Sequence, residues 1–187
     1  MKTRTFVSIL ILILAVMIIT GSSATASDTE IFFKSVRSGD YAEVKRLIGV
    51  GVDVSAQDKY GNTALIWTSR NGHIEVARLL IEEGADVKAQ DNGGVTALMW
   101  ASYLGHQEVA QLIIGAGADV NARNDGGETA LMRASLRGRQ EVVKLLIEEG
   151  ADVNAQDKAG RTALMQASSH GHQEVAQLLI EAGAKEY

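Results

Sequence analysis

The apolar positions of the chain follow two patterns. Residues 6–19 form an almost unbroken apolar run, whereas from residue 58 onward apolar residues recur at helical spacing in short segments that end at glycines. In residues 58–90 this spacing predicts a turn, a first helix that starts after Thr63 and ends at Gly72, and a second helix from Ile74 to Gly84. The chain beyond residue 26 is therefore expected to consist of short helices joined by turns.

This two-helix pattern repeats with a period of 33 residues. The period is visible in three series of residues: Thr63, Thr96, Thr129 and Thr162; Gly39, Gly72, Gly105, Gly138 and Gly171; and Gly51, Gly84, Gly117, Gly150 and Gly183. Helices this short are marginally stable alone, so each pair must bury its apolar face against the next pair. The period predicts an all-α solenoid of helix-turn-helix units with short hairpin-like turns.

The repeating unit resembles the ankyrin repeat. The segment DKYGNTALIWTSRNGHIEVARLLIEEGADVKAQ and its three successors follow that family's order of a turn, Gly-x-Thr, Gly-His, Leu-Leu and Gly-Ala-Asp-Val. Two positions differ from the family pattern: Ala64 and its equivalents replace proline, and Ile66 or a methionine replaces histidine. Alanine is compatible with the first turn of a helix. The second change replaces a ladder of hydrogen-bonded histidines by an apolar one.

The resemblance covers residues 28–187 and implies five repeats. We expect an N-terminal capping repeat at 27–57, followed by repeats at 58–90, 91–123, 124–156 and 157–187. The polar outer face that a terminal repeat requires is expected from Lys34, Arg37, Lys45 and Arg46. The last repeat keeps the apolar pattern of the inner ones, so its outer surface is either a further contact site or a frayed terminus.

The first 26 residues have the features of a secretory signal peptide. Lys2 and Arg4 precede the apolar run, and Ala24-Thr25-Ala26 follows it as a cleavage pattern. The run is shorter than the roughly 20 residues that span a bilayer as a helix. We therefore expect cleavage after Ala26 and a periplasmic or secreted protein. An uncleaved segment would instead tether the same domain to the membrane.

Composition and charge restrict the possible partners. The chain has no cysteine, which excludes disulfides and thiolate chemistry. Its formal net charge is -5, and loss of Lys2 and Arg4 would make the mature chain more acidic still. Nucleic-acid binding requires clustered Lys and Arg in excess. We therefore expect a protein partner and no nucleic acid.

The sequence shows no catalytic or metal-binding constellation. Signatures of a nucleophile elbow, a phosphate loop and a metalloprotease helix are missing. His73, His106 and His172 share one repeat position, where the resemblance implies a structural hydrogen bond, and Arg139 takes that place in the fourth repeat. A spacing of about 10 Å between packed helices is too large for these histidines to share a metal. We therefore expect no cofactor, no metal and no enzymatic activity.

Candidate binding positions are those that vary from repeat to repeat. In ankyrin repeat proteins the partner meets the turn tips and the exposed side of each first helix, which line a concave groove. Carried onto this chain, the resemblance implies partner contacts at Tyr60, Trp67, Arg70, Asn71, Trp100, Tyr103, Leu104, Arg133, Leu136 and Arg137. Trp, Tyr and Arg are the residues most enriched in binding hot spots. Alternatively, Trp67 and Trp100 fill gaps between neighbouring helices.

Three functions are consistent with these patterns. The first is an exported adaptor, scaffold or inhibitor that holds a protein partner in the groove. The second is a scaffold of the same kind that stays tethered to the membrane by its first segment. The third, a ligand-binding or hydrolytic protein, requires titratable groups outside the repeat pattern, and only His170 meets that condition.

Overall fold

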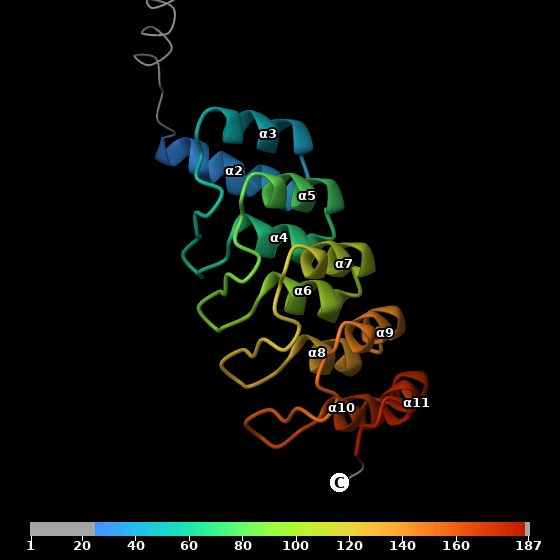
Figure 1. Ribbon diagram of the computed structural model, residues 1–187. Coiled ribbons are helices and arrows are strands. Elements are labelled where there is room, and N and C mark those ends of the chain that lie inside the picture. The colour runs from blue at the N-terminus through green and yellow to red at the C-terminus, as the bar shows by residue number, and fades with distance from the viewer. Residues whose placement is uncertain (1–24, 186–187) are drawn as a thin grey trace, which may run out of the picture.

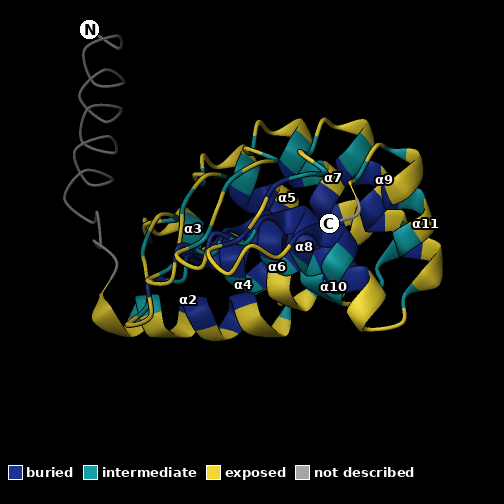
Figure 2. Ribbon diagram, turned by 90° about the horizontal axis from the view of Figure 1, so that it is seen from below, coloured by how far each residue is buried: buried dark blue, intermediate teal, exposed yellow. Residues whose placement is uncertain are grey.

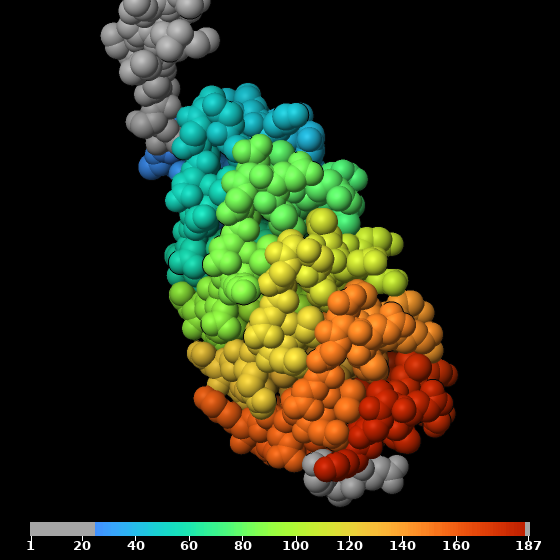
Figure 3. Space-filling view, in the orientation of Figure 1, coloured from blue at the N-terminus to red at the C-terminus, as the bar shows by residue number. Residues whose placement is uncertain are grey.

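The computed structural model describes residues 25–185, which form a stack of helix pairs (Figure 1). The first helices of the pairs are α2 (Ala26–Ser38), α4 (Ala64–Asn71), α6 (Ala97–Leu104), α8 (Ala130–Leu136) and α10 (Ala163–Ser169). The second helices are α3 (Tyr41–Gly49), α5 (Ile74–Glu82), α7 (Gln107–Gly115), α9 (Gln140–Glu148) and α11 (Gln173–Glu181). The predicted all-α solenoid is confirmed, and its repeats form consecutive bands along the surface (Figure 3).

Threonines and glycines set the limits of the first helices. Thr63 has an extended backbone, and its side chain accepts a hydrogen bond from the backbone N–H of Ile66 at 3.3 Å. Gly72 ends the same helix in the left-handed conformation, with φ 77°. A Cβ at Gly72 would also lie 2.7 Å from the ring of His106 in the next repeat. Glycine is therefore required there for both its conformation and its size.

The core lies between the row of first helices and the row of second helices (Figure 2). Leu65, Leu98 and Leu131 occupy equivalent positions and are fully buried or nearly so. Ile66, Met99 and Met132 are also buried, which confirms the predicted apolar ladder in place of the family's histidines. Burying one such side chain contributes about 1.5–3 kcal/mol. Repetition of these contacts stabilises helices that are too short to persist alone.

The turns between repeats are joined to one another by backbone hydrogen bonds. The N–H of Asn92 donates to the carbonyl of Tyr60 at 3.1 Å, and the equivalent bond from Asp125 to Gly93 is 3.0 Å. Lys158 repeats the contact with Gly126 at 2.9 Å. These bonds hold each turn tip in register with the next one.

The N-terminal helix begins at the last residue of the predicted signal peptide. Helix α2 starts at Ala26, and Thr25 caps it through a reciprocal pair of hydrogen bonds with Asp28. Cleavage after Ala26 would remove this cap. Residues 1–24, which carry most of the predicted signal peptide, lie outside the described residues. Within residues 25–185, no helix combines the length and the apolar character needed to cross a membrane.

Candidate interaction surface

Each inner first helix leaves only a few side chains facing outward. In α4, Trp67 is partly exposed and Arg70 and Asn71 are exposed, while most of the remaining helix is buried. These three positions follow the i, i+3, i+4 spacing that places side chains on one face of a helix. The same face in α6 carries Trp100, Tyr103 and Leu104. We call this row of outward positions on α2, α4, α6 and α8 the first-helix face.

Arginines and aromatic rings alternate along the first-helix face. The Cζ atom of Arg37, at the end of α2, lies 5.3 Å from the centre of the Trp67 ring. Arg70 lies over Trp67 at 5.3 Å and over Trp100 at 4.6 Å, so it joins two repeats. Each separation is within the range of cation–π attraction.

The alternation continues into the third and fourth helix pairs. Arg133 lies over Trp100 at 5.1 Å and over Tyr103 at 5.3 Å. Arg137 lies over Tyr103 at 5.0 Å, and the Trp100 and Tyr103 rings meet edge to face at 6.2 Å. We refer to the continuous set as the arginine–aromatic ladder, which consists of Arg37, Trp67, Arg70, Trp100, Tyr103, Arg133 and Arg137.

Asp58 fixes the first tryptophan of the ladder. Its carboxylate accepts the indole N–H of Trp67 at 3.0 Å and the backbone N–H groups of Tyr60 and Asn62, both at 2.9 Å. Burial by itself raises the pKa of Asp58, but these hydrogen bonds to the carboxylate outweigh burial and hold the pKa below its ordinary value. The carboxylate is therefore charged, and it holds the Trp67 ring at the edge of the turn.

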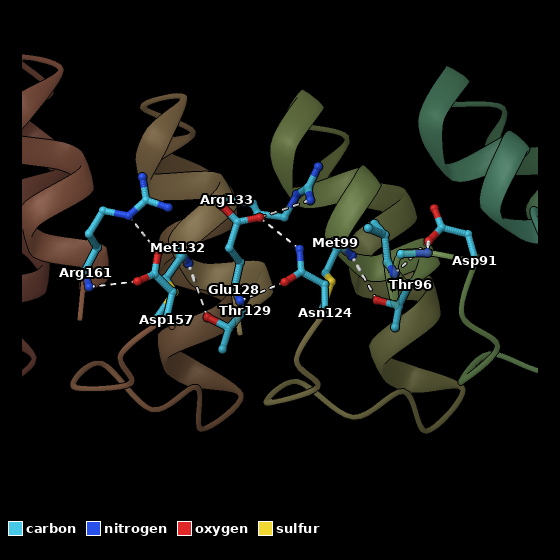
Figure 4. Close-up of polar contacts among 12 residues, drawn as sticks. Asp91, Thr96, Met99, Asn124, Glu128, Thr129, Met132, Arg133, Asp157 and Arg161 are labelled. Atoms are coloured by element: carbon cyan, nitrogen blue, oxygen red, sulfur yellow. Dashed lines mark hydrogen bonds and ion pairs between the residues drawn. The ribbon is translucent and has the colours of Figure 1, made fainter. Parts of the chain in front are cut away.

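The later repeats position their ladder residues by other contacts (Figure 4). Arg133 pairs with Glu128 at 3.5 Å, and Glu128 is itself held by Asn124 at 2.9 Å. The indole nitrogen of Trp100 and the Nε of Arg133 are buried without a hydrogen-bond partner among the described residues. Trp100 therefore lacks the acceptor that Trp67 has, and its polar contacts are instead the cation–π contacts with Arg70 and Arg133.

A hollow of about 670 Å³ lies at the N-terminal end of the ladder. Tyr60 forms part of its wall and is 59% exposed, and the ammonium of Lys59 lies 4.9 Å from the centre of the Tyr60 ring. The hollow is lined by Glu30, Phe33, Arg37, Asp58, Lys59, Tyr60 and Trp67. Two of the predicted binding residues, Tyr60 and Trp67, thus meet in one site.

The structure divides the ten predicted binding residues into groups. Six belong to the ladder and Tyr60 lies beside it. Asn71 donates to the backbone carbonyl of Arg37 at 3.0 Å, so it also joins two repeats. Leu104 and Leu136 are only partly exposed. The alternative in which the tryptophans pack between helices is correct in part, because Trp67 and Trp100 both contact the core, although each ring also lies within cation–π distance of two arginines.

Sequence reasoning missed Arg37 as a member of this surface. We assigned it to the polar outer face of the capping repeat, whereas the structure places it over Trp67 in the next repeat. The 33-residue period could have indicated this position, because Arg37, Arg70 and Tyr103 are spaced 33 residues apart. The roles of Asp58 and Glu128 were also missed, since they depend on side-chain contacts within each turn.

The repeated histidines have the structural role that the resemblance implied. The Nε2 atoms of His73, His106 and His172 lie 3.0, 3.3 and 3.1 Å from the backbone carbonyls at the ends of the preceding first helices. Arg139 makes the equivalent bond to Tyr103 at 3.2 Å. His170, the one histidine outside the period, stacks on His172 with ring centres 6.4 Å apart. In residues 25–185, no three His, Cys, Asp or Glu side chains gather into a potential metal site.

Charge is divided between the first and second helices of the four full repeats. Helices α4, α6, α8 and α10 contain no Asp or Glu, and their charged residues are Arg70 and Arg133. Helices α5, α7, α9 and α11 carry two basic residues, Arg78 and Lys144, against Glu75, Glu82, Glu108, Glu141, Glu148, Glu174 and Glu181. The first helices of the full repeats are therefore basic where their second helices are acidic.

A stack of helix pairs that varies its outward side chains on a constant scaffold defines the class of repeat proteins used for binding. Comparison with family profiles identifies the family: the profile for Ankyrin repeats (3 copies) matches residues 32–124 and 113–186. The chain belongs to the ankyrin repeat family, and these repeats mark it as a protein–protein interaction module. A search of curated proteins found no match.

Proposed function

We propose that this chain is an exported adaptor, scaffold or inhibitor that holds a protein partner against its first-helix face. The observation that carries the proposal is the arginine–aromatic ladder. Ladder residues are of the types that dominate binding hot spots, and they are contiguous over four repeats. Scaffold residues recur at each period, whereas ladder positions change along the stack, from Arg70 to Tyr103 and from Trp100 to Arg133.

The contacts within the ladder prepare it for binding. A free arginine side chain loses considerable rotamer freedom when a partner immobilises it. Arg70 and Arg133 each lie over two rings, so part of that freedom is already lost before the partner arrives. The hydrogen bond from Trp67 to Asp58 restricts the aromatic part in the same way. Preorganisation of this kind favours affinity.

Export is supported by the sequence of the first segment. A positively charged start, an apolar run and a small-residue cleavage pattern occur in the order of a secretory signal. If the segment is retained, the same face would act in a membrane-tethered scaffold. Mass determination of the protein recovered outside the cytoplasm distinguishes the two, because cleavage removes the mass of the apolar segment and retention leaves Met1 or the apolar run in place.

Partner capture by matched variants tests the role of the ladder. Arg70→Gln with Arg137→Gln removes two exposed cations from the ladder without altering the core. Arg78→Gln with Lys144→Gln removes two exposed cations from the second helices and changes the net charge equally. We expect proteins captured by the wild type and by the second variant to be lost with the first. Equal capture by both variants would show that the partner binds elsewhere.

These exposed positions are better probes than the aromatic residues. Trp100 packs against the hydrophobic core, so Trp100→Ala would lower stability as well as remove a contact. Circular dichroism and thermal unfolding of each arginine variant provide the folding control. A folded Arg70→Gln, Arg137→Gln variant that no longer captures the partner separates binding from stability.

A further inference from the structure

We infer that the partner segment bound by the ladder is acidic and extended, with its carboxylates paired to the ladder arginines. The inference rests on the proposed function, because it names the chemistry that the first-helix face recognises. It begins from the charge of that face, which is opposite to the charge of the whole chain, -5.

The ladder arginines have few carboxylate partners within the chain. Of the four, only Arg133 forms an ion pair within residues 25–185, with Glu128. Within the described part of the chain, Arg37, Arg70 and Arg137 have no carboxylate oxygen within 4.0 Å. Their charges are instead placed over aromatic rings, which attract a cation but do not neutralise it. Three cations on one face thus remain available to an anionic group.

The geometry of these contacts favours carboxylates over nucleobases. A guanidinium presents N–H donors around its edge in an arrangement that matches a carboxylate, so an arginine over a ring can still donate to one. Single-stranded nucleic acid is bound by stacking bases on exposed aromatic faces. Arginines already lie over Trp67, Trp100 and Tyr103. The ladder therefore suits an acidic protein segment better than a nucleic acid strand.

The spacing of the repeats indicates the pattern of the partner. Neighbouring helices pack about 10 Å apart, and an extended chain advances about 3.3 Å per residue. One repeat of the scaffold therefore corresponds to about three residues of an extended segment. Arg37 and Arg70 occupy equivalent positions in successive repeats, and Arg137 follows two repeats further along. A segment with an acidic residue at about every third position fits this arrangement.

The intrinsic fluorescence of the protein reports directly on this surface. The chain has two tryptophans, and both belong to the ladder. The probes are a short peptide with Glu at every third position and Ser elsewhere, its Lys counterpart, and an oligothymidine of similar length. Each is titrated into the full chain, into Arg70→Gln with Arg137→Gln, and into the control Arg78→Gln with Lys144→Gln, all verified as folded by circular dichroism.

We expect the Glu peptide to change the tryptophan emission saturably and the Lys peptide to leave it unchanged. The ladder variant should bind the Glu peptide about tenfold more weakly or worse, the control variant should bind as the wild type does, and added salt should weaken binding. Equal binding of the Glu peptide by the two variants would overturn the inference. Tighter binding of oligothymidine than of the Glu peptide would also overturn it, in favour of a nucleic acid ligand.

The proposed function can survive the failure of this inference. If the ladder variant loses its captured protein while no Glu peptide binds the wild type, the face binds a partner of different chemistry and the acidic segment is excluded. If the Glu peptide binds through the ladder, the inference is supported whichever protein carries the segment.

Discussion

Replacing Asp58 by alanine is expected to destabilise the protein more than the same replacement of Asp91. The two residues occupy equivalent positions in consecutive turns, and each accepts two backbone N–H groups, at 2.9 Å for Asp58 and at 2.8 and 2.9 Å for Asp91. Asp58 also accepts the indole N–H of Trp67 at 3.0 Å. Asp91 makes no such bond with Trp100, whose indole nitrogen has no partner among the described residues. The difference between the variants therefore isolates the side-chain contacts of Asp58.

The size of that difference follows from the hydrogen bonds lost. A hydrogen bond to a charged group contributes about 1.5–3 kcal/mol, and the partial exposure of Asp58 places its bond at the lower end. We expect the free energy of unfolding to fall by about 1.5 kcal/mol more for Asp58→Ala than for Asp91→Ala. For a chain of this size that corresponds to roughly 3–6 °C in Tm. The amide of Asn62, which donates to Asp58 at 3.2 Å, adds to the difference.

Thermal unfolding followed by circular dichroism and by tryptophan emission measures both variants. Trp67→Phe keeps most of the ring but removes the indole N–H, so in that background the cost of Asp58→Ala should approach the cost of Asp91→Ala. Equal destabilisation by Asp58→Ala and Asp91→Ala in the wild-type background would refute the reasoning. An unchanged cost of Asp58→Ala in the Trp67→Phe background would refute the part assigned to the indole.

Three further predictions concern the scaffold. Gly72→Ala should lower the free energy of unfolding by about 1 kcal/mol or more, because φ at this residue is +77°. Gly49→Ala should raise the free energy of unfolding by roughly 0.5–1 kcal/mol, because Gly49 lies in a helix and has open space around it. Denaturant unfolding measures both changes. A chain that begins at Ser27 should melt at a lower temperature than one that begins at Thr25, because it lacks the cap of α2; equal melting temperatures would show that the cap is dispensable. Burial raises the pKa of Asp157, but hydrogen bonds from its turn and an adjacent arginine outweigh burial and lower the pKa below its ordinary value of 3.8. The stabilisation that the Asp157 carboxylate provides is therefore present above pH 3.8 and is lost as the pH falls through the lowered pKa. Substitution by Asn should flatten the loss of stability below about pH 4, and an unchanged loss of stability at low pH would contradict this.

The scaffold could be predicted from the sequence because its determinants repeat. A threonine that caps a helix, a glycine that ends it and a leucine that fills the core each recur at one period, so one unit explains all the others. Thr63 and Gly72 have the capping roles that the pattern indicated. Local chemistry and periodicity agree at these positions, and no long-range information is required.

The candidate site could be predicted only as a set of positions. The period places Trp67, Arg70 and Arg133 on one face, but it does not show that Arg70 lies between two tryptophans or that Arg133 pairs with Glu128. Those contacts depend on side-chain rotamers and on the offset between stacked repeats. The cap of α2 was not predicted, since Thr25 lies within the segment that resembles a cleavage site.

The claim that the first-helix face holds a protein partner is tested most directly by photocrosslinking in the cells that make the protein. A photoreactive residue at Asn71, exposed on the first-helix face, is compared with one at Arg78, exposed on the second helix of the same repeat. The proposed function predicts a crosslinked protein from position 71 that is lost when Arg70 and Arg137 are also replaced by Gln. A crosslink that forms from position 78 and not from position 71 would contradict the account.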